Sequence, residues 1–188
     1  REVRLPLPPL PEQIRIAAYL DASCAAIDAA VNAKKKQLEA LTEMKALGQW
    51  ASGILFIGDA GRNSETAILY EDFVRDYVGP LIITRDAVDL LKNSFDQIVN
   101  RPDTVLVTSF AQLQKLFQYV YYPKVLTFSM QLTNLVEALH KFTITYPINI
   151  VAFHKELLIV ASGGEVTTTP CDDPMKIWKG ETATKAAV

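Results

Sequence analysis

The stretch between Glu12 and Leu47 contains neither glycine nor proline and repeats apolar residues at alternating intervals of three and four. This spacing places the repeated residues along one stripe of an α-helix, as in a coiled coil. The repeated positions are Ala17, Leu20, Cys24, Ile27, Val31, Lys34, Leu38, Leu41 and Lys45. Only the two lysines interrupt the apolar pattern. The sequence therefore predicts one helix over residues 11–47, about 55 Å long at 1.5 Å per residue.

A run of prolines precedes this predicted helix. Pro6, Pro8 and Pro9 hold φ near −65° and lack amide donors, which favours an extended chain. Pro11 fits the first helical turn, because the amides there have no helical partner, and Glu12 is favourable next to the positive end of the helix dipole. We therefore expect an extended segment that turns directly into the helix.

A helix of this length exposes its apolar stripe unless another helix covers it. We call this stripe the seam, and we expect it to be a helix-pairing interface. The seam residues expected to make the interface are Leu20, Cys24, Ile27, Val31, Leu38 and Leu41. The predicted partner of residues 11–47 is thus another long amphipathic helix.

Residues 1–47 also resemble the region of type I restriction-modification specificity subunits in which a target-recognition domain ends and a long spacer helix begins. The resemblance is carried by Pro6-Leu7-Pro8-Pro9-Leu10-Pro11-Glu12-Gln13-Ile14-Arg15-Ile16, Tyr19-Leu20-Asp21, Ile27-Asp28 and Lys35-Lys36-Gln37-Leu38. In that family the long helices pair antiparallel and dock the methyltransferase subunits. The resemblance implies that residues 11–47 bind a methyltransferase subunit or a second helix, and that DNA is contacted only within an assembled complex.

The composition excludes several classes of protein. A formal net charge of −2 argues against a free-standing nucleic-acid binder, since phosphate contacts require clustered Lys and Arg. Two cysteines, Cys24 and Cys171, predict no disulfide framework and fit a reducing cytoplasm. No apolar run approaches the roughly 20 residues that span a bilayer. His140 and His154 lack further ligands in a metal-binding pattern, so we expect no metal site.

After Gly48 the pattern changes from one uninterrupted helix to short alternating elements. Apolar runs closed by turn residues predict strands at 54–57, 81–84, 105–107, 148–153, 157–161 and 166–169. Helices are predicted at 63–77, 110–119 and 130–142, with a further one beginning at Asp86; Asn63 or Ser64 is the expected cap of the first. This order predicts an α/β fold with a largely parallel sheet and antiparallel strands at one side. We expect two domains, 1–48 and 49–188.

Residues 54–188 resemble a fragment of the ADP- or ATP-dependent NAD(P)H-hydrate dehydratases of the ribokinase-like superfamily. The matching pieces are Ile57-Gly58, Gly61-Arg62, Pro80-Leu81-Ile82-Ile83, Asp86-Ala87-Val88-Asp89-Leu90-Leu91 and Pro102-Asp103-Thr104-Val105-Leu106. The resemblance implies a partial ribokinase-like sheet with flanking helices, since several opening strands of that fold are missing. ADP or ATP would be the cofactor if this part binds a nucleotide.

Members of that family hold the nucleotide in a glycine-rich turn at a helix start and use the last Asp of this turn as a base. Here the matching stretch is Lys179-Gly180-Glu181-Thr182-Ala183, so Gly180, Glu181 and Thr182 are the nucleotide-binding candidates. Ala183 stands where the Asp belongs, and alanine cannot move a proton. Two further family positions have changed, to Val107-Thr108-Ser109-Phe110-Ala111-Gln112 and to Phe153-His154. We therefore expect no catalytic residue and no catalytic activity from this chain.

Three interpretations of the function follow from these patterns. The first is a specificity-subunit-like protein that joins a DNA-recognition complex through its helix and carries a ribokinase-like fragment. The second is an inactive nucleotide-dependent NAD(P)H-hydrate dehydratase or carbohydrate-kinase relative. The third is that the chain consists of two unrelated gene pieces joined near Gly48.

Overall fold

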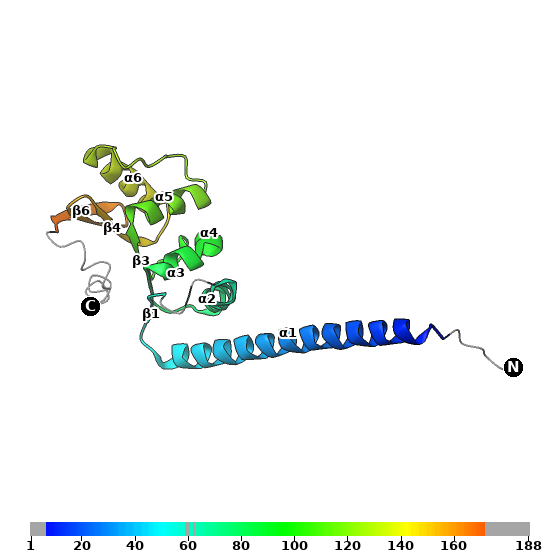
Figure 1. The fold of residues 1–188 in the computed structure, drawn as a ribbon. Coiled ribbons are helices and arrows are strands. Elements are labelled where there is room, and N and C mark those ends of the chain that lie inside the picture. Colours follow the sequence, from blue (N-terminus) through cyan, green and yellow to red (C-terminus); the bar gives the residue numbers. More distant parts are fainter. Residues whose placement is uncertain (1–6, 59–60, 62, 172–188) are drawn as a thin grey trace. The chain divides into compact units, whose positions relative to one another are not determined.

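The computed structural model describes residues 7–58, 61 and 63–171. The chain divides into two compact units, residues 1–42 and residues 43–188. One long helix, α1 (Leu10–Trp50), supplies nearly all the described structure of the first unit, and its last two turns belong to the second. The second unit contains the sheet (Figure 1).

The start of α1 has the predicted arrangement, in which a proline run leads directly into the helix. The carbonyl of Pro9 accepts hydrogen bonds from the amides of Glu12 (2.8 Å) and Gln13 (3.0 Å). The Gln13 side chain returns a bond from Nε2 to the Pro8 carbonyl at 2.7 Å. Pro11 lies in the first turn, where its missing amide costs nothing. The predicted transition from proline run to helix is confirmed, with the first helical residue at Leu10.

The far end of α1 extends three residues beyond the predicted limit of 47 because Gly48 does not end the helix. Gly48 is the buried residue of α1, and a Cβ atom there would lie 3.3 Å from Phe73 Cζ and 3.4 Å from both Ile54 Cδ1 and Tyr77 Cδ2. The close approach of these side chains explains the glycine. Tertiary packing thus outweighs the low helix propensity of glycine, which is about 1 kcal/mol below that of alanine.

Six strands form one sheet whose spatial order follows the chain, β1-β2-β3-β4-β5-β6. The strands are β1 (Ile54–Phe56), β2 (Leu81–Thr84), β3 (Thr104–Ser109), β4 (Asn149–His154), β5 (Leu157–Ser162) and β6 (Glu165–Pro170). β1 to β4 pair in parallel, and β5 and β6 are added antiparallel. The predicted α/β class, with a largely parallel sheet and hairpins at one side, is confirmed.

The helices of the second unit lie on one side of this sheet (Figure 1). They are α2 (Ser64–Asp76), α3 (Asp86–Leu90), a 3₁₀ turn at Lys92–Ser94, α4 (Phe95–Ile98), α5 (Phe110–Tyr119) and α6 (Leu132–Thr145). Asn63 caps α2 as predicted, accepting a bond from the Thr66 amide at 2.7 Å. The last helix begins two residues later than predicted and continues to Thr145.

The helical side of the sheet holds the main core. Phe56, Ile83 and Leu106 stand opposite one another in register and therefore point to the same face. On that face Phe56 stacks on Tyr70 of α2 with ring centroids 4.5 Å apart and meets Phe73 edge to face at 5.5 Å. A second apolar cluster occupies alternate positions of the strands, at Leu55, Ile82, Val105, Val107, Val151 and Leu158.

Arg101, in the turn before β3, joins three separate parts of the unit. Its guanidinium donates to the carbonyls of Val74, Tyr77 and Gly79, and its Nε donates to Thr104 Oγ1. These contacts link the end of α2 and the loop before β2 to the beginning of β3. One long side chain thereby fixes the amino ends of two neighbouring strands.

Gly58 gives a test of how closely the turn after β1 must approach α3. Its φ is +98°, and a Cβ atom would lie 2.3 Å from the Ala87 backbone nitrogen. We expect Gly58→Ala to lower the free energy of unfolding by about 2–4 kcal/mol, because strain and backbone overlap add. Urea unfolding followed by near-ultraviolet circular dichroism measures the change.

Gly163→Ala is the matched control, since Gly163 also has a positive φ (+55°) but an added Cβ meets nothing within 4 Å. This variant should lose only about 1 kcal/mol. Equal losses in the two variants would mean that the approach to α3 is not tight.

Candidate functional site

Ligands of open parallel sheets bind beyond the carboxyl ends of the strands. In this chain β1 to β4 run parallel, so their carboxyl ends lie at one edge of the sheet. We call this the carboxyl edge; it comprises Gly58, Arg85, Thr108, Ser109 and His154 at the ends of these four strands. Ser109 and His154 belong to the two described segments in which the sequence departs from the dehydratase pattern.

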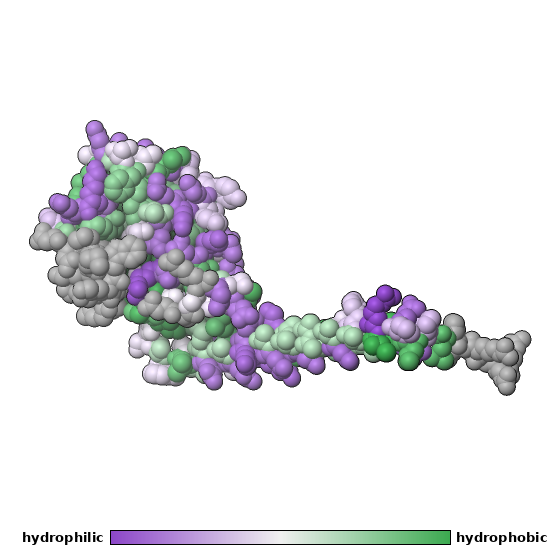
Figure 2. All heavy atoms as spheres, viewed as in Figure 1, coloured by the Kyte–Doolittle hydropathy of each residue, from purple (hydrophilic) through white to green (hydrophobic). Residues whose placement is uncertain are grey.

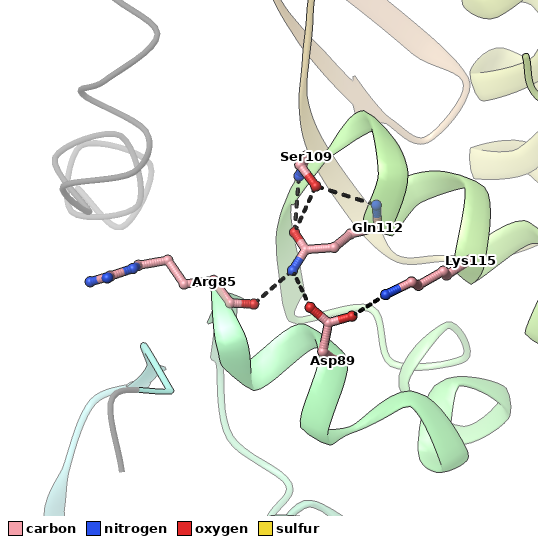
Figure 3. A network of polar contacts seen from close by, with 5 residues as sticks. All are labelled: Arg85, Asp89, Ser109, Gln112 and Lys115. Atoms are coloured by element: carbon pink, nitrogen blue, oxygen red, sulfur yellow. Dashed lines mark hydrogen bonds and ion pairs between the residues drawn. The ribbon is translucent and has the colours of Figure 1, made fainter. Parts of the chain in front are cut away.

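Arg85 has an unusual backbone conformation for a residue with a side chain. Its φ is +54° and its ψ is −130°, outside the regions that L-residues populate readily. The Gln112 side chain holds this residue in place, because Nε2 donates to the Arg85 carbonyl at 2.8 Å. The guanidinium of Arg85 points away from Gln112 (Figure 3). Such conformations cost about 1–3 kcal/mol and persist only where neighbouring groups enforce them.

Gln112 is the centre of a polar network that links α3 to α5 (Figure 3). Besides the Arg85 carbonyl, its Nε2 donates to Asp89 Oδ2 at 3.0 Å, and its Oε1 accepts from the Ser109 amide at 3.0 Å. Lys115 Nζ lies 2.7 Å from the other oxygen of Asp89. Both amide hydrogens of Gln112 are therefore used, and its carbonyl is occupied as well.

Ser109 forms a capping box with Gln112 at the start of α5. Its hydroxyl lies 3.3 Å from the Gln112 amide as acceptor and 3.2 Å from Oε1 as donor. These contacts satisfy the exposed amides of the first turn. Because the hydroxyl of Ser109 is already donating to an amide oxygen, the network braces the carboxyl edge and does not activate a nucleophile.

His154 lies within apolar surroundings at the end of β4. Its imidazole is 2% exposed and packs against the rings of Phe110, at 4.5 Å between centroids, and Phe128, at 5.1 Å. Neither ring nitrogen has a hydrogen-bond partner within the described part of the chain, and the same holds for the buried Oγ1 of Thr108 on neighbouring β3. Burial lowers the pKa of His154, with a smaller contribution from Lys155.

The predicted nucleotide-binding residues Gly180, Glu181 and Thr182 lie outside the described residues, as does Ala183. The described glycine of the carboxyl edge serves another purpose. A Cβ atom at Gly58 would overlap Asp86 and the backbone of Ala87, so this glycine permits the close approach of the turn after β1 to α3.

The predicted helix-pairing residues lie along α1 with their side chains at the surface. Leu20, Ile27, Val31 and Leu38 are 53%, 62%, 46% and 66% exposed. Cys24 is exposed with a free thiol, and Leu41 is half-buried. Figure 2 shows hydrophobic residues at the surface along α1. The seam is thus available for contact with another helix.

The described residues form neither a metal-ligand cluster nor a membrane-spanning helix. Residues 7–58, 61 and 63–171 hold no group of three or more His, Cys, Asp or Glu side chains arranged to bind a metal ion. No helix in the same ranges is both long and apolar enough to cross a bilayer.

Sequence reasoning missed the network around Gln112. The Ser-x-x-Gln spacing of Ser109 and Gln112 is a readable capping-box signal. In contrast, no local pattern connects Gln112 to Asp89 or to Arg85, since each contact joins residues more than 20 positions apart. The positive-φ conformation of Arg85 has no sequence signal, because glycine is the residue that adopts such a conformation readily.

The comparisons with known proteins support the fold. No protein-family model matches the chain, and no curated protein matches it by sequence. Among solved structures, it is similar to a ribokinase-like superfamily protein from Enterococcus faecalis V583, with a TM-score of 0.50 and 16% identity. The match covers 71% of this chain and 45% of that one, so the chain spans less than half of that structure. The α/β unit therefore has a partial ribokinase-like fold.

The buried imidazole of His154 predicts loss of stability in acid. Its folded pKa lies below the ordinary value of 6.5, so the unfolded chain binds more protons as the pH falls through 6.5. The free energy of unfolding should decrease from pH 8 towards pH 5.5, with a slope of at most about 1.4 kcal/mol per pH unit from this residue. His154→Leu should flatten the slope, as measured by urea unfolding at each pH.

The other histidine of the chain provides the control. His140 is exposed, and its Nδ1 contacts the Gly164 carbonyl. The variant His140→Gln should keep the pH dependence that His154 causes. An unchanged slope in His154→Leu would contradict the assignment.

Proposed function

We propose that this chain is a specificity-subunit-like assembly component of a DNA restriction-modification complex, which it joins through the seam of α1. The observation that carries the proposal is the row of exposed apolar side chains at heptad spacing, with Ile27 62% exposed and Leu38 66% exposed. The class of complex is inferred from the resemblance of residues 1–47 to type I specificity subunits. DNA is contacted within that complex and not by this chain alone, in keeping with its net charge of −2.

Burial of the seam by a partner helix favours association. Fully burying an exposed large aliphatic side chain is worth about 1.5–3 kcal/mol. Since Leu20, Ile27, Val31 and Leu38 are 46–66% exposed, covering them offers on the order of 3–7 kcal/mol in all. The loss of translational and rotational freedom opposes this gain. A partner helix that also covers Cys24 and Leu41 adds to the gain.

The two lysines of the seam limit which partner helix fits. Lys34 and Lys45 occupy positions that are otherwise apolar. A polar residue at such a position selects register and partner at some cost in stability. Lys45 contacts Asp76 within the α/β unit, which leaves Lys34 as the position that selects the partner. We expect the partner helix to place a carboxylate opposite Lys34, or to leave the Lys34 ammonium group in contact with solvent.

The seam is tested with the full chain, both alone and mixed with the methyltransferase subunit of a type I system. Light scattering after size-exclusion chromatography should detect a self-associated species or a stoichiometric complex. The variant Ile27→Glu places a charge in the seam and should weaken association at least tenfold, a loss of about 1.4 kcal/mol or more.

The matched control is Ala29→Glu, which adds the same charge nearly half a turn away on the same helix. Ala29 is exposed and lies off the seam. This variant should associate as the unmodified chain does. A monomeric, unbound chain at about 100 μM, or equal weakening by the two substitutions, would refute the proposal.

A second candidate is supported by the ribokinase-like fold of the α/β unit: an inactive nucleotide-dependent relative of the NAD(P)H-hydrate dehydratases. The candidate residues are Gly180, Glu181 and Thr182, without a catalytic Asp at Ala183. Binding of ADP or ATP to the folded state alone should raise the melting temperature with increasing ligand, by the linkage between binding and unfolding. Absence of a shift at millimolar ADP and ATP would exclude this candidate.

A further inference from the structure

A surface pocket of about 300 Å³ lies at the end of the sheet opposite to the carboxyl edge. It is lined by the 3₁₀ turn and α4 on one side and by the ends of α5 and α6 on the other. Two of its lining residues, Asn100 and Tyr146, come shortly before the amino ends of β3 and β4. The pocket is therefore separate from the candidate functional site and from the seam.

The end of α5 places one tyrosine of this pocket in a costly conformation. The amide of Tyr121 bonds to the Gln118 carbonyl at 3.1 Å, and the amide of Tyr122 bonds to the Phe117 carbonyl at 2.9 Å. This pair of bonds is a Schellman motif, in which the residue at the position of Tyr121 is usually glycine. Tyr121 has a φ of +52°, which a side chain disfavours.

The fold gains little from the tyrosine at this position. The Tyr121 side chain is 93% exposed, so its ring contributes almost no buried area. Glycine would complete the same motif without strain. A strained and solvated aromatic residue beside a pocket therefore requires an explanation other than stability, and contact with a ligand is such an explanation.

The lining combines aromatic surfaces with short polar groups. Phe95 and Val99 are buried and form the floor, and Phe95 holds Tyr119 edge to face at 5.9 Å. Tyr119, Tyr121 and Tyr146 provide aromatic surface, and the rim carries Lys92, Asn93, Asp96 and Asn100. Asn100 uses its Nδ2 to bond to the Asp96 carbonyl at 2.6 Å, which orients its amide oxygen as a further acceptor.

We propose that this pocket binds a neutral pyranose sugar, with one face of the sugar ring stacked on Tyr121. The C–H groups of a pyranose face pack on an aromatic ring, while its hydroxyl groups both donate and accept hydrogen bonds. The carboxylate of Asp96 and the amides of the rim suit such hydroxyls. The rim carries one cation, Lys92, and one carboxylate, Asp96, so the lining is formally neutral, as a neutral ligand requires.

The test uses the full chain, its assigned two-dimensional amide NMR spectrum and two probes, methyl α-D-glucopyranoside and methyl β-D-galactopyranoside. At about 50 mM of each, enough for a millimolar dissociation constant, at least one sugar should shift the amide signals of residues 92–100 and 119–122 in a saturable manner. Uridine, which offers a planar base to the same aromatic surface, is the comparison ligand. No saturable shift with either sugar, or tighter binding of uridine, overturns the proposal.

The variant Tyr121→Gly separates binding from folding. It should raise the melting temperature by a few degrees, because the strain is removed, and weaken sugar binding at least fivefold. Val78→Ala, at another exposed apolar side chain (87% exposed), should leave both the sugar affinity and the shifted signals unchanged. Unaltered sugar affinity in Tyr121→Gly overturns the role given to Tyr121.

Discussion

The parallel pairing of β1 to β4 is the constraint on which the rest of the α/β unit depends. Each of these strands lies beside its neighbour in the chain, so every return from one strand to the next passes along the same side of the sheet. Right-handed connections then place the intervening helices on one face. The same pairing gathers the ends of the four strands at one edge, where Arg85, Ser109 and His154 meet the start of α5.

The sequence predicted the elements that local patterns specify. The strand at 81–84 and the helix at 110–119 agree with the observed bounds of β2 and α5, because a continuous apolar run and a Ser-led amphipathic segment carry strong local signals. The continuation of α1 through Gly48 was missed, since it depends on Phe73 and Tyr77 far along the chain. At the carboxyl edge, the positions of Ser109 and His154 could be anticipated, but the bonds of Gln112 to Arg85 and Asp89 arise only in the folded chain.

The two units of the chain bury apolar side chains in different ways. In residues 43–188 the large apolar residues of the strands and helices enclose one another, as the fully buried Phe73, Phe95 and Phe142 illustrate. In α1 the regular spacing of Ile27, Val31 and Leu38 leaves each of them at the surface. The helical pattern is continuous across both units, yet only its last two turns belong to the second. Periodicity alone therefore identifies a helix without identifying what covers it.

The chain-ordered arrangement of the six strands also bears on how the sheet is made. Each strand pairs with the next strand in the chain, and the antiparallel pairings of β4 with β5 and of β5 with β6 close short hairpins at a small entropic cost. During synthesis, β2 can join β1 before β3 has left the ribosome, and the hairpin of β5 and β6 completes the sheet last. Assembly can thus proceed in one direction, without waiting for a distant strand to be inserted between two others.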